Sequence, residues 1–213
     1  MPKRKPSPHV APALDAATLK AFAHPLRLRM YDYLKDHGAA TASMLARAMG
    51  ENTGQTSYHL RQLERHGLVE EDTSRGSARE RWWTSVGFSF GLEAVAQDTA
   101  ARTAAQTVML HQMEMRNARV QEWIARMESE DEAWAGIATS NEATAMLTWE
   151  EADALGDAIA ATMTEHLERA KAARAEHGEE GARRVKLYQL LFPLPPEEPP
   201  GPEGRLSAAG GMP

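Results

Sequence analysis

Hydrophobic residues in the first third of the chain recur at the three- and four-residue spacing of short amphipathic helices. Asp15 suits the N-terminal cap of the first helix, and the His24-Pro25 pair ends it, because the residue before a proline is disfavoured in the helical region. Proline suits the first turn of the helix that follows, and Gly38 lies where its left-handed C-terminal cap belongs. The buried face predicted for this second helix consists of Leu26, Leu28, Met30, Tyr31 and Leu34.

Two more short helices follow, and a turn that contains a glycine joins them. Thr41 opens the first of the two, which ends at Gly50. Asn52 and Gln55 resemble a capping box at the start of the second, which is predicted over residues 53–66. Two short helices with such a turn, the second carrying a polar face, form the pattern of a helix-turn-helix.

The second of these helices has one apolar face and one polar face. Leu60 and Leu63 are predicted to point inward together with Thr56, which leaves amide, hydroxyl and guanidinium groups on the outside. Such groups bind base edges and phosphates, although a polar, solvated helix with no ligand is the alternative. Asn52 also caps the helix, and His59 is expected to pack or to bind phosphate rather than to read bases. The residues predicted to contact DNA are Asn52, Thr53, Gln55, Ser57, Tyr58, His59 and Arg61.

A basic β-hairpin is predicted directly after this helix. Gly67 ends the helix, a strand begins at Leu68, and residues 73–78 form a turn before a second strand over residues 79–84. Beside a DNA-reading helix such a hairpin is a wing that lies along the phosphate backbone, whereas on its own it would be an ordinary surface hairpin. The predicted phosphate-binding residues of this wing are Arg75, Arg79 and Arg81.

Two motifs in this part of the chain resemble those of a known family. The pattern L-A-x-x-L-G followed by S-x-H-L-x-x-L-x-x-x-G-L-V is matched in register between Leu45 and Val69, with Met49 in place of a leucine. An H-P-L-R signature is matched by residues 24–27. Residues 15–90 therefore resemble the winged-helix domain of ArsR-like bacterial transcription regulators.

The resemblance implies a fold, a partner and a mode of action. It implies a mainly α fold with a small β wing, in which the helix over residues 53–66 enters the major groove of double-stranded operator DNA. It also implies a homodimer, and it favours repression. Metal sites of the family are not matched, because the helix TASMLARAMG has no cysteine and Thr164 stands where a histidine-containing site needs an aspartate.

Charge divides the chain into a basic part and an acidic part. Residues 1–90 hold 13 Lys and Arg against 9 Asp and Glu, a net charge of +4, whereas the remaining residues have a net charge of −10. This asymmetry suits a DNA-binding domain joined to a second module. Lys3, Arg4 and Lys5 lie in a Pro-rich arm that is predicted to be disordered and to add non-specific phosphate contacts.

The second half of the chain is predicted to contain two long helices. The first covers residues 92–127, and its alanine-rich surface allows close packing either against a second copy or within its own monomer. The second begins at a capping box that starts with Thr148 and runs to Glu176. The flanking residues 145–147 and 184–192 could be strands of a small β-α-β unit. The predicted parts of the chain are a disordered basic arm over 1–14, a winged-helix DNA-binding domain over 15–90, a helical dimerisation and possible effector domain over 91–192 and a disordered tail over 193–213.

Large, flexible apolar side chains in the second half could line an adaptable pocket for a small hydrophobic effector. Packing in a core or in a dimer interface is the alternative explanation for the same residues. The candidate effector-binding residues are Met109, Met113, Trp123, Met127 and Trp134.

Several functional classes are excluded or disfavoured by what the sequence lacks. It contains no cysteine, which excludes disulfides and thiolate metal sites. It has no apolar run long enough to span a membrane and no secretory signal, so we expect a cytoplasmic protein without a membrane partner. A glycine-rich phosphate loop, a metal-ligand cluster and a nucleophile elbow are also missing, so we expect no metal, no cofactor and no enzyme activity.

Taken together, these patterns predict a homodimeric, sequence-specific DNA-binding transcription regulator. In this hypothesis the helix over residues 53–66 reads the major groove, and the hairpin over residues 69–84 acts as the wing. The alternative is a winged-helix protein-interaction module without specific DNA binding. Affinity for duplex DNA no stronger than that of a charge-matched control would favour the alternative.

Overall fold

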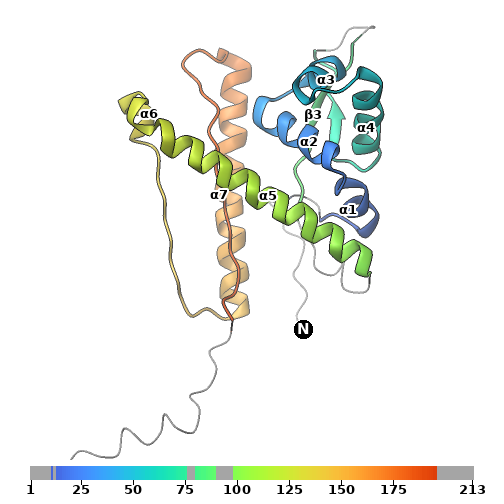
Figure 1. The fold of residues 1–213 in the computed structure, drawn as a ribbon. Coiled ribbons are helices and arrows are strands. Elements are labelled where there is room, and N and C mark those ends of the chain that lie inside the picture. The colour runs from blue at the N-terminus through green and yellow to red at the C-terminus, as the bar shows by residue number, and fades with distance from the viewer. Residues whose placement is uncertain (1–10, 12, 76–79, 90–97, 196–213) are drawn as a thin grey trace, which may run out of the picture.

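The computed structural model describes residues 11, 13–75, 80–89 and 98–195. In its N-terminal half, helices pack against a small sheet, and a long helix leads out of that half toward the C-terminal helices (Figure 1). The mainly α fold with a small β-sheet that the sequence predicts is confirmed. The elements in chain order are α1 (Ala16–Phe22), α2 (Pro25–His37), β1 (Ala40–Thr41), α3 (Ala42–Met49), α4 (Thr53–Arg65), β2 (Val69–Glu71), β3 (Trp82–Ser85), α5 (Thr99–Arg126), the 3-10 turn η2 (Met127–Ser129), α6 (Glu132–Ala135) and α7 (Trp149–His177).

Side-chain caps determine where the first helices begin. The Asp15 carboxylate accepts a hydrogen bond of 2.7 Å from the Thr18 amide at the start of α1. Pro25 is the first residue of α2, and Nδ1 of His24 accepts a hydrogen bond from the Leu26 amide. α3 and α4 also begin after capping residues, a threonine and an asparagine. The predicted starts of these four helices are therefore confirmed.

Two of these helices end at glycines whose φ angles are positive. Gly50, after α3, has φ 71° and ψ 31°, which is the expected left-handed helical conformation. Gly38, after α2, has φ 83° but ψ −159°, so the left-handed helical cap predicted there is wrong in its ψ angle. The difference arises because the chain must leave α2 in an extended direction to enter β1, which begins at Ala40.

β3 forms the centre of a three-stranded antiparallel sheet in the order β1-β3-β2. Ala40 of β1 pairs with Trp83, and Val69 of β2 pairs with Ser85. The hairpin of β2 and β3 is the predicted one, although β3 begins at Trp82, later than predicted. The sequence does not predict β1, because two residues are too few to show the alternation that identifies a strand.

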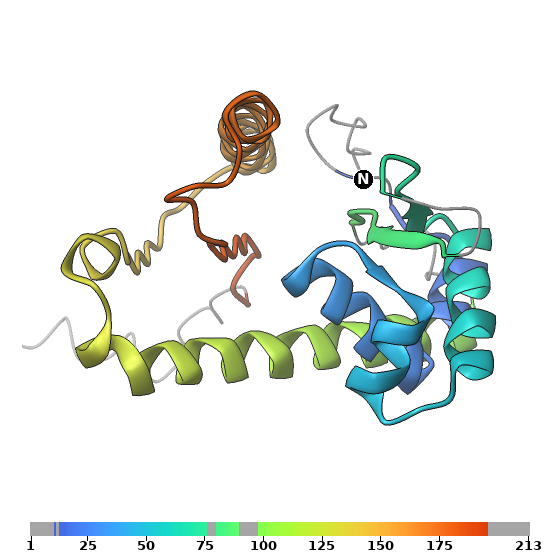
Figure 2. The ribbon, with the colours of Figure 1, turned by 90° about the horizontal axis from the view of Figure 1, so that it is seen from above.

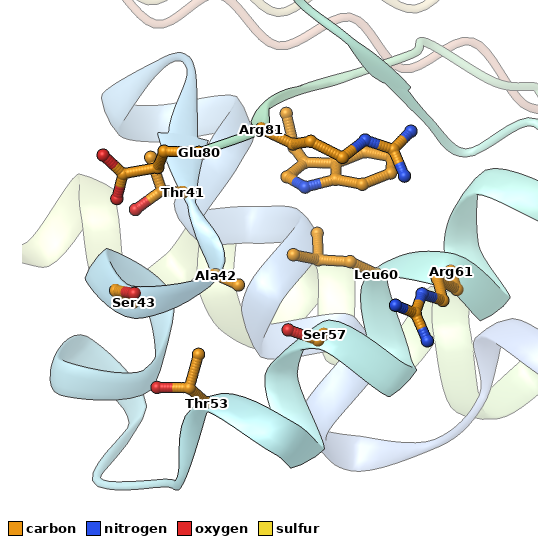
Figure 3. Close-up of a pocket in the computed structure, with 10 residues that line it drawn as sticks. Thr41, Ala42, Ser43, Thr53, Ser57, Leu60, Arg61, Glu80 and Arg81 are labelled. Carbon is orange, nitrogen blue, oxygen red and sulfur yellow. The ribbon is translucent and has the colours of Figure 1, made fainter. Parts of the chain in front are cut away.

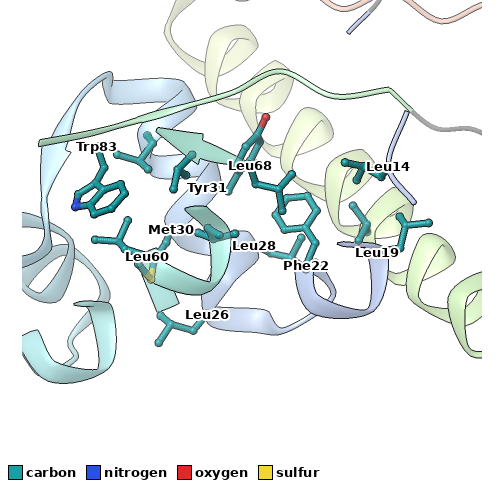
Figure 4. Packing of buried hydrophobic residues seen from close by; sticks show 14 of the residues in the cluster. Leu14, Leu19, Phe22, Leu26, Leu28, Met30, Tyr31, Leu60, Leu68 and Trp83 are labelled. Atoms are coloured by element: carbon teal, nitrogen blue, oxygen red, sulfur yellow. The ribbon is translucent and has the colours of Figure 1, made fainter. Parts of the chain in front are cut away.

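The core of the N-terminal half is formed by residues from α1, α2, α4 and the sheet (Figure 4). Phe22 is fully buried, and its ring packs edge-on against the rings of Tyr31 and Phe88 at centroid distances of 5.0 and 5.3 Å. The Tyr31 hydroxyl donates a hydrogen bond of 2.7 Å to the Val86 carbonyl, which ties α2 to the chain after β3. Burial raises the pKa of Tyr31, which keeps this hydroxyl protonated as a donor. All five residues predicted for the buried face of α2 are buried.

α5 packs its first turns onto the N-terminal half. Asp98 caps the helix by accepting a hydrogen bond of 3.0 Å from the Ala101 amide. α5 therefore begins at Thr99 rather than at residue 92 as predicted, and residues 92–97 lie outside the described residues. Small side chains allow these turns to lie close to α1. The buried residues of α5 are Ala101, Ala104, Ala105 and Val108.

Two acidic residues of α2 hold the middle of α5. Oδ2 of Asp32 lies 2.6 Å from Nε2 of His111, and Oδ2 of Asp36 accepts hydrogen bonds of 2.8 and 3.0 Å from the Arg119 guanidinium. Burial raises the pKa of Asp32 more than its hydrogen bond with His111 lowers it. Asp36 also pairs with Lys186, which lies after α7. These contacts determine the direction in which α5 leaves the N-terminal half.

α7 follows an irregular segment that starts after α6. Its capping box is confirmed, because the Thr148 amide donates to the Glu151 carboxylate and the Glu151 amide donates to the Thr148 hydroxyl. The β-α-β unit considered from the sequence is wrong. Residues 145–147 and 184–192 form no strand, because neither has a neighbouring strand to pair with in the described part of the chain.

The described residues of the C-terminal half form no hydrophobic core of their own. Among the described residues, Val108 is the last hydrophobic side chain that is buried. Polar contacts hold the segment after α7: Arg183 donates hydrogen bonds of 2.6 and 3.1 Å to Glu130, and its guanidinium lies 4.9 Å from the centre of the Trp134 ring. Apolar side chains of α5, α7 and this segment therefore remain on the surface. Among the helices described, none is both long and apolar enough to cross a membrane.

Candidate nucleic-acid interface

α3 and α4 are joined in a fixed relative orientation by their buried sides. The Thr56 hydroxyl, fully buried on α4, donates a hydrogen bond of 2.9 Å to the Ala42 carbonyl at the start of α3. Leu60 and Leu63 of α4 are also buried, together with Leu45 of α3. The inward positions predicted for α4 are therefore confirmed, and they determine which side of α4 faces outward.

The outward side of α4 brings together the polar residues that the sequence singles out. Asn52 caps the helix by accepting a hydrogen bond of 2.9 Å from the Gln55 amide. The residues exposed there are Asn52, Thr53, Gln55, Tyr58 and Arg61, while Ser57 is partly buried. Among the described residues of this half, Tyr58 is the most exposed large apolar side chain, at 56%. The contact of these residues with DNA stays a prediction.

An open hollow of about 210 Å³ lies between α3, α4 and β3 (Figure 3). Thr53, Ser57 and Arg61, which are four residues apart and so lie along one line of α4, face into it. Glu80 and Arg81 line it from the hairpin side. The lining residues, including Ser43, which the sequence did not point to, provide hydroxyl and guanidinium groups that bind phosphates or base edges.

The arginines of the predicted wing differ in their surroundings. Arg81 pairs with Glu71 at 2.6 Å and with Glu64 of α4 at 3.1 Å, and its guanidinium lies 4.4 Å from the centre of the Trp83 ring. This arginine therefore links the hairpin to α4. Arg75 lies 3.5 Å from Asp72 and is exposed. Arg79 lies outside the described residues, as do residues 76–78 of the predicted turn.

Two histidines and an arginine join the start of α2 to α4, and the sequence does not predict this cluster. The rings of His24 and His59 lie 4.6 Å apart, and Nη1 of Arg27 lies 3.4 Å from Nδ1 of His59. His59 is 9% exposed, so its position agrees with the packing role considered for it, and its phosphate role stays a prediction. Burial lowers the pKa of both histidines; the positive charge of Arg27 lowers both further, and His24 also lowers that of His59.

Acidification is expected to destabilise the protein through this cluster. A histidine whose pKa is lower in the folded state than in the unfolded chain takes up protons more readily when unfolded. The free energy of unfolding should therefore fall as the pH drops below 6.5, the usual pKa of histidine, and the loss should level off below the lower folded pKa values of His24 and His59. Urea unfolding at several pH values between 8 and 5 measures the slope of the free energy of unfolding against pH.

A matched pair of variants tests the assignment to the cluster. The slope should become shallower in His24→Gln/His59→Gln, which lacks both imidazole rings of the cluster. His166→Gln/His177→Gln replaces two exposed histidines of α7 and should keep the parent slope. An unchanged slope in the first variant would show that other groups cause the pH dependence.

The candidate effector-binding residues do not surround a described hollow. Met109, Met113 and Met127 are 45–48% exposed along α5 and η2. Trp123 is covered by the guanidinium of Arg126 at 5.1 Å, and Trp134 by that of Arg183. The hollow beside α4 and a second one near Ala13 and Phe88 are lined by other residues. An effector site at these five residues stays a prediction.

Comparison with known families agrees with this arrangement of helices. A family model described as a helix-turn-helix domain matches residues 22–72, which include α2, α3, α4 and β2. Residues 22–72 therefore form a helix-turn-helix domain. Such a domain points to a non-enzymatic protein that binds DNA, as the sequence predicts. A comparison with curated protein sequences finds no match.

Two solved structures align with about half of the chain. The YusO protein from Bacillus subtilis is 15% identical, and the alignment covers 51% of this chain and 82% of that chain with a TM-score of 0.30. A double mutant of ZitR from Lactococcus lactis, in apo form, is 16% identical, with coverage of 53% and 77% and a TM-score of 0.23. At these TM-scores the two alignments add nothing to the assignment, which rests on the helix-turn-helix match and the geometry.

Proposed function

We propose that the protein is a homodimeric transcription regulator that binds a specific DNA sequence through its helix-turn-helix domain. α4 enters the major groove, and the hairpin of β2 and β3 lies along the phosphate backbone as a wing. Repression is the mode of regulation favoured by the ArsR-like motifs, and the site of action is the cytoplasm, where bacterial DNA lies. The observation that carries the proposal is the outward side of α4, which gathers polar side chains on a helix whose other side is buried.

Each exposed group on α4 can perform a distinct task in the groove. Arg61 can bind guanine bidentately, and Gln55 can donate to and accept from adenine simultaneously. Thr53 and Ser57 have hydroxyls suited to bases or phosphates, and they share the hollow with Arg61. Because Arg81 is paired with Glu64 and Glu71, it supports the orientation of the wing before DNA is bound.

Arg61→Ala is expected to weaken binding to the specific site by about 1–3 kcal/mol and to relax the preference at one base pair. The loss should be much smaller on random duplex DNA, because non-specific binding depends on the summed phosphate contacts. Fluorescence anisotropy with both DNAs at several salt concentrations measures the two affinities. Arg169→Ala, which removes an exposed arginine from α7, is the charge-matched control and should leave both affinities unchanged.

The target site can be found by capture of fragmented genomic DNA with the full-length protein, the Arg61→Ala variant and the Arg169→Ala control. Enrichment of a shared inverted repeat, with half-sites about one helical turn apart, is expected for the parent and the control and should be lost with Arg61→Ala. Uniform, salt-sensitive recovery with all three proteins would contradict specific binding, and it would favour a winged-helix module that binds another protein.

A further inference from the structure

Two histidine rings are in contact at the place where α2 begins beside α4. The ring centres of His24 and His59 lie 4.6 Å apart, with an angle of 39° between their planes. His59 is 9% exposed, and its ring also meets the edge of the Tyr58 ring at a centre-to-centre distance of 5.2 Å. His24 is exposed, so water and protons reach the pair from its side. We call His24, Arg27 and His59 the histidine cluster.

The hydrogen bonds of the histidine cluster require both rings to be neutral. Nδ1 of His24 accepts a hydrogen bond of 3.2 Å from the Leu26 amide, and Nδ1 of His59 lies 3.4 Å from Nη1 of Arg27. Amide and guanidinium groups can only donate, so Nδ1 of each ring must be free of a proton and Nε2 must have one. A second proton on either ring would occupy Nδ1 and remove that contact.

Protonation would also place like charges side by side. Arg27 is held between the helices because its Nε donates a hydrogen bond to the Ala21 carbonyl near the end of α1. If both rings were protonated, three positive charges would lie together. The negative charge of Glu51 favours a protonated His59, but burial, His24 and Arg27 lower the pKa of His59 by more than Glu51 raises it. The closed cluster therefore belongs to neutral pH.

The histidine cluster acts on the orientation of α4. His59 lies on α4 between Ser57 and Arg61, which face the hollow beside the wing. Thr56 and Leu60 are buried on the other side of α4 and hold it against α3 and the core. Loss of the contacts at His59 would therefore change the orientation of α4 relative to α2 rather than unfold the helix. A binding site tolerates only a small displacement of its side chains.

We propose that the histidine cluster is a proton-sensitive switch, which holds α4 in the orientation for specific DNA binding at neutral pH and releases it in acid. The proposal rests on the proposed function, because the site that it regulates is the outward side of α4. The pKa values of both histidines are lowered in the closed cluster, so an opened cluster takes up protons as the pH falls below 6.5. Between pH 8 and pH 5.5, protonation favours opening by at most about 10-fold for each histidine.

A direct contact of His59 with a DNA phosphate would give a pH dependence of the opposite sign. A phosphate beside the ring favours the protonated form, so binding would strengthen in acid. The geometry favours release instead, because Nδ1 of His59 already faces the positive charge of Arg27 and the ring is nearly buried. The sign of the pH dependence therefore distinguishes the two roles of His59.

The switch is tested with the full-length protein by fluorescence anisotropy at pH 8 and pH 5.5, at equal ionic strength. The probes are the inverted repeat recovered by genomic capture at pH 8 and a random duplex of the same length. Relative to the affinity for the random duplex, the affinity for the repeat should fall at least about 5-fold at pH 5.5. A relative affinity that stays constant or rises in acid would overturn the proposal.

A matched pair of variants assigns the pH dependence to the cluster. In His24→Asn/His59→Asn, an amide oxygen near the position of each Nδ1 can still accept a hydrogen bond but does not titrate. This variant should bind the repeat more weakly at pH 8, because the ring contacts are lost, and its pH dependence should disappear. If the rings had only a structural role, the variant would keep the pH dependence of the parent.

His166→Gln/His177→Gln is the control, since it removes the same number of histidines from exposed positions on α7. Figure 2 shows α4 at the end of the molecule away from α6 and α7. The control should therefore keep the pH dependence of the parent. Loss of the pH dependence in the control would assign the effect to α7 and overturn the role of the histidine cluster.

Hydrogen–deuterium exchange of the free protein tests the switch without DNA. After correction for the intrinsic exchange rate at each pH, protection of the α4 amides should fall at least about 5-fold between pH 8 and pH 5.5 in the parent and in the control. It should stay constant in His24→Asn/His59→Asn. Constant protection of α4 in the parent would overturn the proposal even if the protein binds a specific site. Acid-sensitive protection together with equal recovery of all DNA at pH 8 would support the switch and contradict the proposed function.

Discussion

Phe22→Ala is expected to lower the free energy of unfolding by about 3–5 kcal/mol, because the change leaves a cavity at the centre of the core. Phe22 is fully buried, and its ring contacts those of Tyr31 and Phe88. These contacts join α1 to α2 and to the chain that follows β3. Urea denaturation followed by circular dichroism measures the loss, at a single protein concentration, because association with a second copy would add to the apparent stability.

Phe192→Ala is the matched control, since it removes the same atoms from a side chain that is 66% exposed. Its effect should be within about 0.5 kcal/mol of zero. If the two variants were equally stable, the rings of Phe22, Tyr31 and Phe88 could not form the centre of the core. A loss confined to Phe22→Ala would show that the stability of the N-terminal half depends on the contacts of Phe22, at the end of α1, with Tyr31 and Phe88.

The start of each N-terminal helix could be predicted because its signal is local. Asp15, His24 and Asn52 accept hydrogen bonds from amides within three residues of themselves, so a short stretch of sequence contains both partners of each contact. The buried side of α4 could be predicted for the same reason, because the helical repeat alone separates Leu60 and Leu63 from the polar positions.

The features that the sequence does not reveal depend on partners far away in the chain. β1 is a strand only because Ala40 and Thr41 pair with Trp83 and Trp82. Residues 184–192 show alternating hydrophobicity yet form no strand, because the described chain offers them no partner. Alternation indicates a tendency to pair, and the neighbouring strand decides whether pairing occurs.

The candidate interface also combines features that have a local sequence signal with features that depend on partners far away in the chain. The polar side of α4 follows from helical spacing, so its exposed residues could be named in advance. The pairing of Arg81 with Glu64 and Glu71, and the contact of His24 with His59, join positions from separate elements. Their geometry changes the expected role of Arg81, from a free phosphate-binding group to one that also holds the wing against α4.

Gly38→Ala is expected to lower the free energy of unfolding by about 2–3 kcal/mol. With φ 83° and ψ −159°, Gly38 occupies a region of backbone conformation that is nearly restricted to glycine. An added Cβ would also approach Nη2 of Arg184 to 2.7 Å, although that flexible side chain can move away. The backbone is therefore the main cause of the loss, which urea denaturation at fixed protein concentration measures.

Gly50→Ala measures how much a positive φ alone costs in stability, without the extended ψ that Gly38 has. Gly50 also ends a helix with a positive φ, 71°, but its ψ of 31° is left-handed helical, and a Cβ there would meet no atom within 4 Å. Alanine should cost only about 1 kcal/mol at Gly50, and asparagine, which tolerates this conformation, should cost less. Asparagine should give no such relief at Gly38. Equal losses at the two glycines would mean that the extended exit from α2 is not strained, and that the direction of β1 beside the wing does not depend on glycine at position 38.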